Sequence, residues 1–173
     1  MGRMTSFAIR RARTPDVAGI RLLVKPLADQ RVLLEKEAVA YYENLQEFFV
    51  AEDQDGAIVG CGALHVMWED IAEVRTLATS ADWRGRGVGA ALLARLMEEA
   101  RDIGVARVFC LTFEVDFFRR HGFEVMADQS VVDPVVYSEL LRSTDEGVAE
   151  FLDLARVKPN TLGNTRMIAH FGS

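Results

Sequence analysis

The sequence predicts a mixed α/β fold in which a central mixed β-sheet is flanked by helices. Short apolar segments with period-two alternation indicate strands, and segments whose apolar residues recur every three or four positions indicate helices. Up to residue 126 they follow one another in the order β-α-α-β-β-β-α-β-α-β. The chain has 173 residues, 50% of them hydrophobic, so it can form a sizeable core. No linker-like stretch divides it, and we expect residues 1–173 to form a single domain.

The first helix is predicted by its start signal and by its apolar spacing. It follows a strand expected at residues 7–12. Thr14 can cap the helix and Pro15 suits its first position. Pro26 limits how far the helix can continue. The apolar residues at helical spacing are Val17, Ile20, Leu23, Val24 and Leu27.

The later elements follow from the same periodicities and from the turn residues between them. A helix is expected at residues 37–45 and a strand at 47–52, before the hairpin-type turn Asp53–Gly56. In the next strand, Gly60 and Gly62 are expected to mark a bulge or a close approach. The further expected elements are strands at 57–68 and 71–79, a helix at 91–100, a strand at 107–112, a helix at 114–121, a strand at 123–126, a helix at 134–141 and a strand at 165–171.

Composition argues against two classes of protein. The net charge of −6 opposes a general nucleic-acid binder, because phosphate contacts need a basic surface. No apolar run approaches the roughly 20 residues that span a bilayer, and the N-terminus lacks the apolar core of a signal peptide. We therefore expect a cytoplasmic protein with small-molecule ligands and no nucleic-acid or membrane partner. Strand edges near the C-terminus make a homodimer an expectation.

The cysteines and histidines show no metal-binding pattern. Cys61 and Cys110 each lie in an apolar, strand-like segment without another Cys or His at ligand spacing. We expect free, buried thiols and no metal. His65 and His121 could serve as bases, although an isolated His in such a segment is more often packed or hydrogen-bonded.

A glycine-rich turn, Arg84–Ala90, joins a predicted strand to a predicted helix. Glycines allow backbone angles closed to other residues and let a ligand approach the main chain. The first N–H groups of a helix lack partners within it, and the helix dipole is positive there. The turn therefore indicates a phosphate-binding site.

Two common phosphate motifs fit this turn poorly. The P-loop requires Gly-Lys-Ser/Thr, which the sequence lacks. The dinucleotide fingerprint requires Gly-x-Gly-x-x-Gly, whereas the spacing here is Gly85-x-Gly87-x-Gly89.

The spacing Arg84-x-x-Gly87-x-Gly89 resembles the Arg/Gln-x-x-Gly-x-Gly/Ala signature of the GNAT superfamily of acetyltransferases. The order of elements fits as well, so the resemblance covers nearly the whole chain. It implies acetyl-CoA as co-substrate: the turn binds its pyrophosphate, and the preceding strand pairs with its pantetheine arm. The cofactor-binding residues so implied are Leu77, Ala78, Thr79, Arg84, Gly85, Arg86, Gly87, Val88, Gly89 and Ala90.

Further segments resemble the acetyltransferase domain of N-acetylglutamate synthases, and the tail resembles the short, stand-alone actinobacterial type. These segments are Leu33–Lys36, Gly60–Leu64, Glu73–Ala78, Val108–Thr112, Phe117–Phe123 and the tail Lys158–Met167. The resemblance implies acetylation of the α-amino group of L-glutamate, or of the similar L-glutamine, as the first step of arginine biosynthesis. The sequence has no counterpart of the amino-acid-kinase domain that carries arginine feedback in the longer bacterial synthases. The existence and site of such feedback stay open.

Glu73 and Arg75 stand among the apolar residues of a central strand. Buried charges are costly unless they are paired, and residues two apart in a strand share one face. The two side chains therefore either pair with each other or serve the reaction. The resemblance makes Glu73 the general base that deprotonates the attacking amine, directly or through a water.

The general acid is less clear from the sequence. Many GNAT enzymes place a Tyr near the end of the helix before Gly-Phe, and the matching residue here is Phe118, which cannot donate; we group it with the cofactor-binding residues. Thr112 matches a hydroxyl position of the synthases and is the candidate acid. Alternatively, its hydroxyl bonds to the backbone and the thiolate leaves unprotonated. Other hydroxyl candidates are Tyr41, Tyr42 and Tyr137.

A glutamate-like acceptor needs local cations for its carboxylate, preferably forked ones. Lys36 lies where the family places a basic residue on the substrate, between its first two helices. The alternative for Lys36 is a solvated lysine at a helix start. The alternative for Arg166 is a surface residue of a strand. The substrate-binding residues implied are Lys36, Arg75, Thr76, Leu111, Asn164, Thr165 and Arg166.

Two other functions fit parts of the pattern. One is a GNAT enzyme that acetylates another small amine or a protein N-terminus. The other is a non-catalytic domain that senses acetyl-CoA or arginine. Glu73 and a complete phosphate turn favour an enzyme.

Overall fold

The computed structural model describes residues 6–30, 36–126, 134–143, 145, 148 and 164–171. The strands are β1 (Phe7–Arg11), β2 (Phe48–Asp53), β3 (Ile58–Trp68), β4 (Ile71–Thr79), β5 (Arg107–Thr112), β6 (Glu124–Val125) and β7 (Thr165–His170). The helices are α1 (Val17–Asp29), α2 (Ala38–Glu43), α3 (Val88–Ile103), α4 (Val115–Arg120) and α5 (Pro134–Leu140). Short 3-10 helices span Thr14–Asp16, Leu45–Glu47 and Ala81–Trp83. None of the described helices could cross a membrane.

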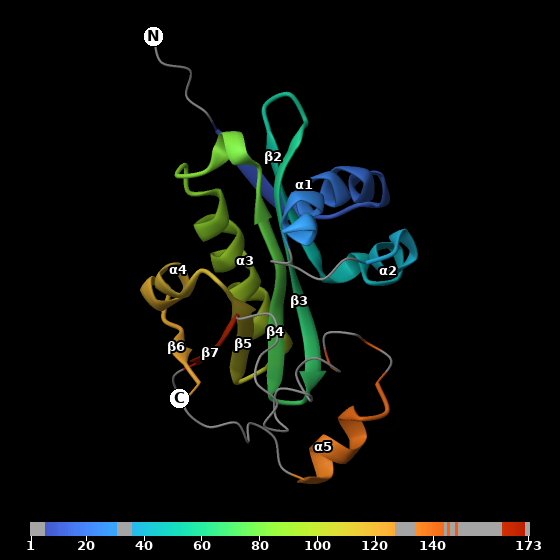
Figure 1. Cartoon of the computed structure of the whole chain (residues 1–173), viewed down its shortest axis with the longest axis vertical. Coiled ribbons are helices and arrows are strands. Elements are labelled where there is room, and N and C mark those ends of the chain that lie inside the picture. The colour runs from blue at the N-terminus through green and yellow to red at the C-terminus, as the bar shows by residue number, and fades with distance from the viewer. Residues whose placement is uncertain are drawn as a thin grey trace. The chain divides into compact units, whose positions relative to one another are not determined.

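The seven strands form one mixed sheet in the order β1-β2-β3-β4-β5-β7-β6, which confirms the predicted fold class (Figure 1). The chain forms two compact units. The first comprises Met1–His65 and Val74–Gly104, and the second comprises Val66–Glu73 and Val105–Ser173. Strands β3 and β4 each continue from one unit into the other. The single domain over residues 1–173 stays a prediction.

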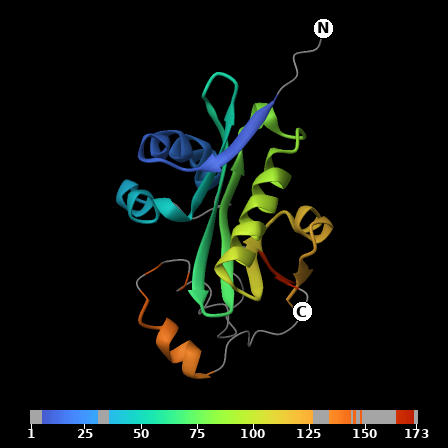
Figure 2. The same ribbon diagram turned by 180° about the vertical axis from the view of Figure 1, so that it is seen from behind.

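The first unit has helices on both faces of its strands. β1 pairs antiparallel with β2, and β2 pairs antiparallel with β3. Helices α1 and α2 lie on one face and α3 on the other, as the front and back views show (Figures 1 and 2). The predicted apolar stripe of α1 is confirmed, because Val17, Ile20 and Val24 are buried. They pack in a cluster with Tyr41, Phe48, Val50, Cys61, Ala63 and Ala78.

Gly60 and Gly62 allow α3 to lie directly against β3. A Cβ atom at Gly60 would be 2.6 Å from Cγ1 of Val88, and one at Gly62 would be 2.9 Å from Cδ1 of Leu96. Both distances are too short for real contacts, so a larger residue would force these α3 side chains, or the helix that carries them, to shift. The expected close approach is confirmed, whereas the register shift of this strand pair lies in β2, between Ala51 and Glu52.

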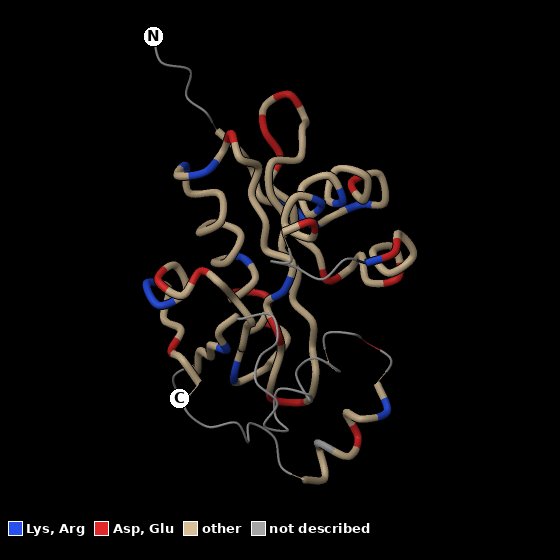
Figure 3. Tube along the Cα trace, viewed as in Figure 1, with Lys and Arg blue, Asp and Glu red and all other residues tan. Residues whose placement is uncertain are grey.

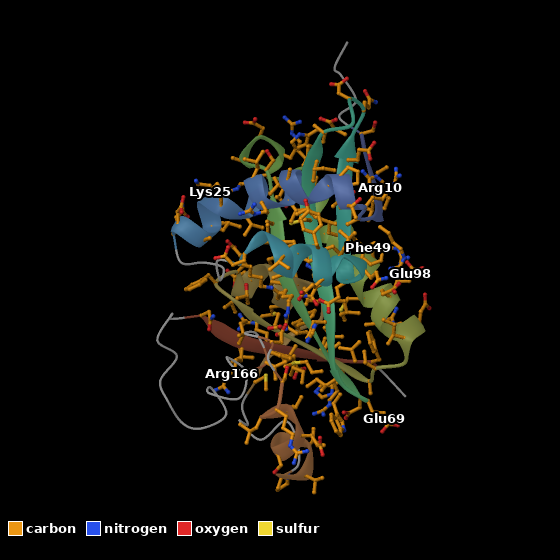
Figure 4. All side chains as sticks on the ribbon, turned by 90° about the vertical axis from the view of Figure 1, so that its right-hand side faces the viewer. Arg10, Lys25, Phe49, Glu69, Glu98 and Arg166 are labelled. Atoms are coloured by element: carbon orange, nitrogen blue, oxygen red, sulfur yellow. The ribbon has the colours of Figure 1, made fainter. Side chains whose placement is uncertain are left out.

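The prediction that Thr14 caps the first helix was wrong. Thr14 begins a short 3-10 helix whose N-cap is Arg13. The capping acceptor is instead Asp16, whose Oδ2 accepts a hydrogen bond of 2.7 Å from the backbone N–H of Arg13. A carboxylate is a stronger acceptor than a hydroxyl. Asp16 also meets the guanidinium of Arg10 through two bonds, of 2.7 and 2.9 Å, and is itself buried. Figure 4 labels Arg10 on β1.

We expect the Asp16–Arg10 pair to stabilise the fold in a pH-dependent way. The hydrogen bonds from Arg10 hold the pKa of Asp16 below its usual value, more than burial raises it. A carboxyl group with a lower pKa when folded adds stability above its unfolded pKa, near 4, and loses it as the pH falls through the folded pKa. The change Asp16→Asn should lower the free energy of unfolding by about 1–2 kcal/mol at pH 7.

Urea unfolding at pH 7 and below pH 4 measures this effect. The difference between the parent and Asp16→Asn should shrink at the lower pH. Asp55→Asn, at an exposed carboxylate of the β2–β3 turn, is the matched control and should change stability little. A loss that is equal at both pH values would contradict the ion-pair explanation.

The second unit is built on β5 and β7. The start of β4 pairs in parallel with β5, and β5 and β6 both pair antiparallel with β7. Its main described core cluster comprises Met67, Ile71, Phe109, Leu140, Val148 and Ile168. The helix predicted at residues 134–141 is therefore confirmed and reaches this core through Leu140.

Candidate active site

The glycine turn before α3 has the backbone geometry that its sequence predicts. Gly85 has φ of 77° and Gly87 has φ of 83°, both in the left-handed region. Gly87 is the N-cap of α3, so the helix begins at Val88, three residues earlier than expected. Arg84 and Arg86 are exposed in this turn, which Figure 3 shows in blue before the helix.

The N-terminus of α3 can bind an anion. The helix has 16 residues, and no side chain caps its first turn. The first intrahelical bond runs from the N–H of Ala91 to the carbonyl of Gly87, at 3.0 Å. The N–H groups of Val88, Gly89 and Ala90 precede it and have no acceptor within the helix by geometry. Together with the dipole and two arginines, they suit a phosphate or pyrophosphate group.

Thr76 distorts the middle of β4. Its φ is 57°, and Thr76 is the single described non-glycine residue with a positive φ. A β-branched residue rarely adopts this conformation, which costs on the order of 1–3 kcal/mol. Such strain persists where the surroundings impose it, and it often accompanies function. The distortion directly precedes Leu77, Ala78 and Thr79, of which Ala78 is buried and the other two half-buried.

Both cysteines are free and buried, as predicted. Burial raises the pKa of the Cys61 thiol to about 12. Burial also raises the pKa of the Cys110 thiol, and the nearby Glu73 carboxylate raises it further. Neither thiol is therefore an active nucleophile at neutral pH. Cys61 instead donates a hydrogen bond of 3.3 Å from Sγ to the carbonyl of Thr76.

Glu73 is a buried carboxylate in a regular part of β4. It is 4% exposed and lies opposite Phe109 in the parallel ladder with β5, whose register ends at this pair. Arg75 follows two residues later and is half-buried. Strand alternation directs both side chains to the same face. Such a carboxylate can accept a proton where water is excluded.

The register of β5 with β7 sorts the predicted site residues of the second unit by face. Leu111 lies opposite Arg166, and Thr112 lies opposite Thr165. Residues opposite each other in a ladder share a face, and neighbours along a strand alternate. Arg166 and Leu111 therefore share the face of Phe109, which is also the face of Glu73. Thr112 and Thr165 lie on the other face.

The hydroxyl of Thr112 already has a backbone partner. Its Oγ1 accepts a hydrogen bond of 2.8 Å from the N–H of Glu114, just before α4 begins. The hydroxyl of Thr112 thus bonds to the backbone, as the alternative to a role as general acid predicts. Because a hydroxyl can donate and accept at once, its own hydrogen can still be donated. A role as general acid stays a prediction.

Phe118 belongs to the packed aromatic cluster beside α4. It is 5% exposed, and its ring centroid lies 5.1 Å from that of Phe117 and 5.2 Å from that of Phe123. These contacts give it a structural role, and its contact with a cofactor stays a prediction.

The remaining candidates are spread over the two units. Lys36 is half-buried just before α2, and Asn164 is half-buried just before β7. Tyr41 is buried in the core of the first unit, whereas Tyr42 is 52% exposed. The side chain of Tyr137, residues 33–35 and the tail 158–163 lie outside the described residues.

The histidines are held by local contacts. Nδ1 of His65 lies 2.6 Å from Oε1 of Glu47, and Nδ1 of His121 lies 2.7 Å from the carbonyl of Phe117. This fits the packed or hydrogen-bonded role that we expected for them.

Comparison with known proteins identifies the relatives of this chain. The family model of the acetyltransferase (GNAT) domain matches residues 44–125. The chain is 52% identical to an amino-acid acetyltransferase of Mycobacterium tuberculosis, over 92% of both chains. It is 32% identical to an amino-acid acetyltransferase of Neisseria meningitidis, over 72% of this chain and 29% of that protein.

Solved structures agree with these relatives. The Rv2747 protein of Mycobacterium tuberculosis, in complex with CoA and NLQ, superposes with a TM-score of 0.88 at 51% identity, over 95% of this chain and 99% of that one. N-acetylglutamate synthase from Neisseria gonorrhoeae, complexed with coenzyme A and N-acetyl-glutamate, superposes with a TM-score of 0.77 at 24% identity. That match covers 99% of this chain and 37% of the synthase and shows a shared fold.

Proposed function

Because the chain is an amino-acid acetyltransferase that belongs to the GNAT family, we propose that it transfers the acetyl group of acetyl-CoA to the α-amino group of L-glutamate or L-glutamine. The observation that carries the acceptor assignment is the shared face of Glu73 and Arg166 in the second unit. One side chain can take a proton from an amine, and the other can bind a carboxylate. This activity would catalyse the first step of arginine biosynthesis. A cytoplasmic location and a homodimer stay predictions.

The turn before α3 supports the donor side of the proposal. The N–H groups of Val88, Gly89 and Ala90 would bind the pyrophosphate of acetyl-CoA, with Arg84 and Arg86 as cations. The solved structure at 51% identity to this chain is that of a complex with CoA. The main chain of Leu77–Thr79 would hydrogen-bond the pantetheine arm as an added strand does.

The reaction itself requires one proton acceptor and a path for the thiolate. The amine nitrogen attacks the thioester carbonyl carbon, and Glu73 takes the proton, directly or through a water. The tetrahedral intermediate then collapses, the C–S bond breaks, and CoA leaves as the thiolate. Thr112 stays the candidate from the sequence for a hydrogen bond to this sulfur, although its side chain lies on the other face of the β5–β7 ladder; the alternative is that the thiolate leaves unprotonated.

A thiol-release assay with acetyl-CoA and each of the twenty amino acids tests the proposal. We expect the highest kcat/KM with glutamate or glutamine. A higher value with an unrelated amino acid would overturn the acceptor assignment. Tight acetyl-CoA binding without thiol release with any amino acid would instead indicate a sensor.

Lys36→Ala should raise the KM for the amino acid by about tenfold, because a charge-assisted hydrogen bond to a carboxylate contributes about 1.5–3 kcal/mol and Lys36 is only half-buried. The KM for acetyl-CoA should change little. Steady-state kinetics with each substrate varied in turn measures both values. Lys25→Ala, at an exposed lysine of α1 labelled in Figure 4, is the control. A change confined to acetyl-CoA would exclude Lys36 from the acceptor site.

A further inference from the structure

The distorted stretch of β4 has its main chain bonded to one side chain of β3. Thr76 is 8% exposed and has φ of 57°. The Sγ–H of Cys61 donates to the Thr76 carbonyl at 3.3 Å, and Cys61 is fully buried. A backbone hydrogen bond from Ala78 to the same sulfur lowers the thiol pKa, against the larger rise caused by burial. The thiol thus donates to one end of the stretch and accepts from the other.

These two bonds meet a need that the distortion creates. A residue in the left-handed conformation turns its peptide groups away from regular ladder positions. A buried carbonyl or N–H that leaves the ladder needs another partner. The thiol pKa of about 12 keeps Cys61 protonated at neutral pH, so the hydrogen that bonds Thr76 is always present.

The neighbours of Cys61 leave little freedom for β3 to move. Gly60 and Gly62 face α3 closely, and a Cβ at Gly62 would also lie 3.0 Å from Cδ1 of Leu77. Cys61 itself points to the opposite face, in the cluster that contains Val50 and Ala63. The sulfur therefore reaches β4 from a strand that is fixed on both faces.

We propose that Cys61 is a positioning residue, which holds Thr76–Ala78 in the shape that binds the pantetheine arm of acetyl-CoA. The cofactor role of Leu77–Thr79 in this inference rests on the proposed function. Cys61 acts through the β4 main chain and takes no part in bond making. A hydroxyl at this position could make the same two bonds, whereas a methyl group could make neither.

Three variants separate positioning from core packing. Cys61→Val fills the space without hydrogen bonding, and Cys61→Ser hydrogen-bonds at the expense of some apolar burial. Val50→Ala is the control, because Val50 lies opposite Cys61 in β2 and is fully buried without a bond to β4 through its side chain. Thermal unfolding should show that all three lower stability.

We expect Cys61→Val to raise the KM for acetyl-CoA about 5- to 20-fold and to leave the KM for the amino acid within about twofold. Cys61→Ser should restore the KM for acetyl-CoA even where its melting temperature is lower. Amide hydrogen exchange by NMR should show faster exchange of the Ala78 N–H in Cys61→Val than in Val50→Ala. Unchanged KM and exchange in Cys61→Val, or no recovery in Cys61→Ser, would overturn the inference.

Calorimetric titration with CoA distinguishes a failure of this inference from a failure of the proposed function. If no amino acid is acetylated, the proposed function fails, and the ratio of CoA Kd values between Cys61→Val and the parent still decides the role of Cys61. If the parent itself does not bind CoA, the positioning role is also overturned.

Discussion

Glu73→Gln should lower kcat by about 100-fold or more, because general-base catalysis contributes on the order of 10²–10⁴ to such reactions. The amide has nearly the same shape as the carboxylate but cannot accept the amine proton. Binding of acetyl-CoA should persist, since the turn before α3 lies on another part of the chain. We therefore expect the KM for acetyl-CoA to stay within about twofold of the parent value.

The pH dependence provides a second test of Glu73. Without a base, turnover depends on the small fraction of amine that is already neutral. The residual rate of Glu73→Gln should then rise about tenfold per pH unit until the pH approaches the amine pKa. Parent and variant rates should consequently converge at high pH.

Glu69→Gln is the matched control for Glu73. Glu69 is an exposed carboxylate in the turn before β4, on the same stretch of chain (Figure 4). Its turnover should equal that of the parent. Near-normal turnover of Glu73→Gln at neutral pH would remove Glu73 from the mechanism.

Local signals made part of the backbone geometry and burial at the candidate site predictable from the sequence. The glycines of the turn before α3 predict a left-handed backbone, and Gly85 and Gly87 have the positive φ values that the motif requires. Glu73 was recognisable because a charge in an apolar strand is uncommon. In each case, the cause lies within a few residues of its effect.

The features that the sequence did not predict depend on partners distant along the chain. Nothing local in β4 indicates a left-handed Thr76, and the side chain that bonds its carbonyl, Cys61, lies on β3. The pairing of Leu111 with Arg166 needs the β5–β7 register, which is set by the fold. The Thr14 cap is the exception and failed for a local reason, because the carboxylate of Asp16, two residues on, accepts the hydrogen bond from the N–H of Arg13 and is held by Arg10.

Gly87→Ala should raise the Kd for CoA by about tenfold or more, because several oriented N–H bonds to the pyrophosphate, each about 1.5–3 kcal/mol, depend on this backbone. A Cβ at Gly87 meets no protein atom within 4 Å, so the added methyl causes no clash within the protein. It acts instead by straining the positive φ of 83° and by occupying space that the ligand approaches.

The same helix offers a control with a similar left-handed backbone. Gly104 caps the C-terminus of α3 with φ of 107°, and a Cβ there also meets nothing within 4 Å. Gly87→Ala and Gly104→Ala should each lower the free energy of unfolding by about 1–2 kcal/mol, the cost of a left-handed L-residue. Only Gly87→Ala should weaken CoA binding in calorimetric titrations. If both variants bound CoA equally weakly, the loss of affinity would come from general destabilisation of α3. The assignment of its N-terminus to the pyrophosphate would then be wrong.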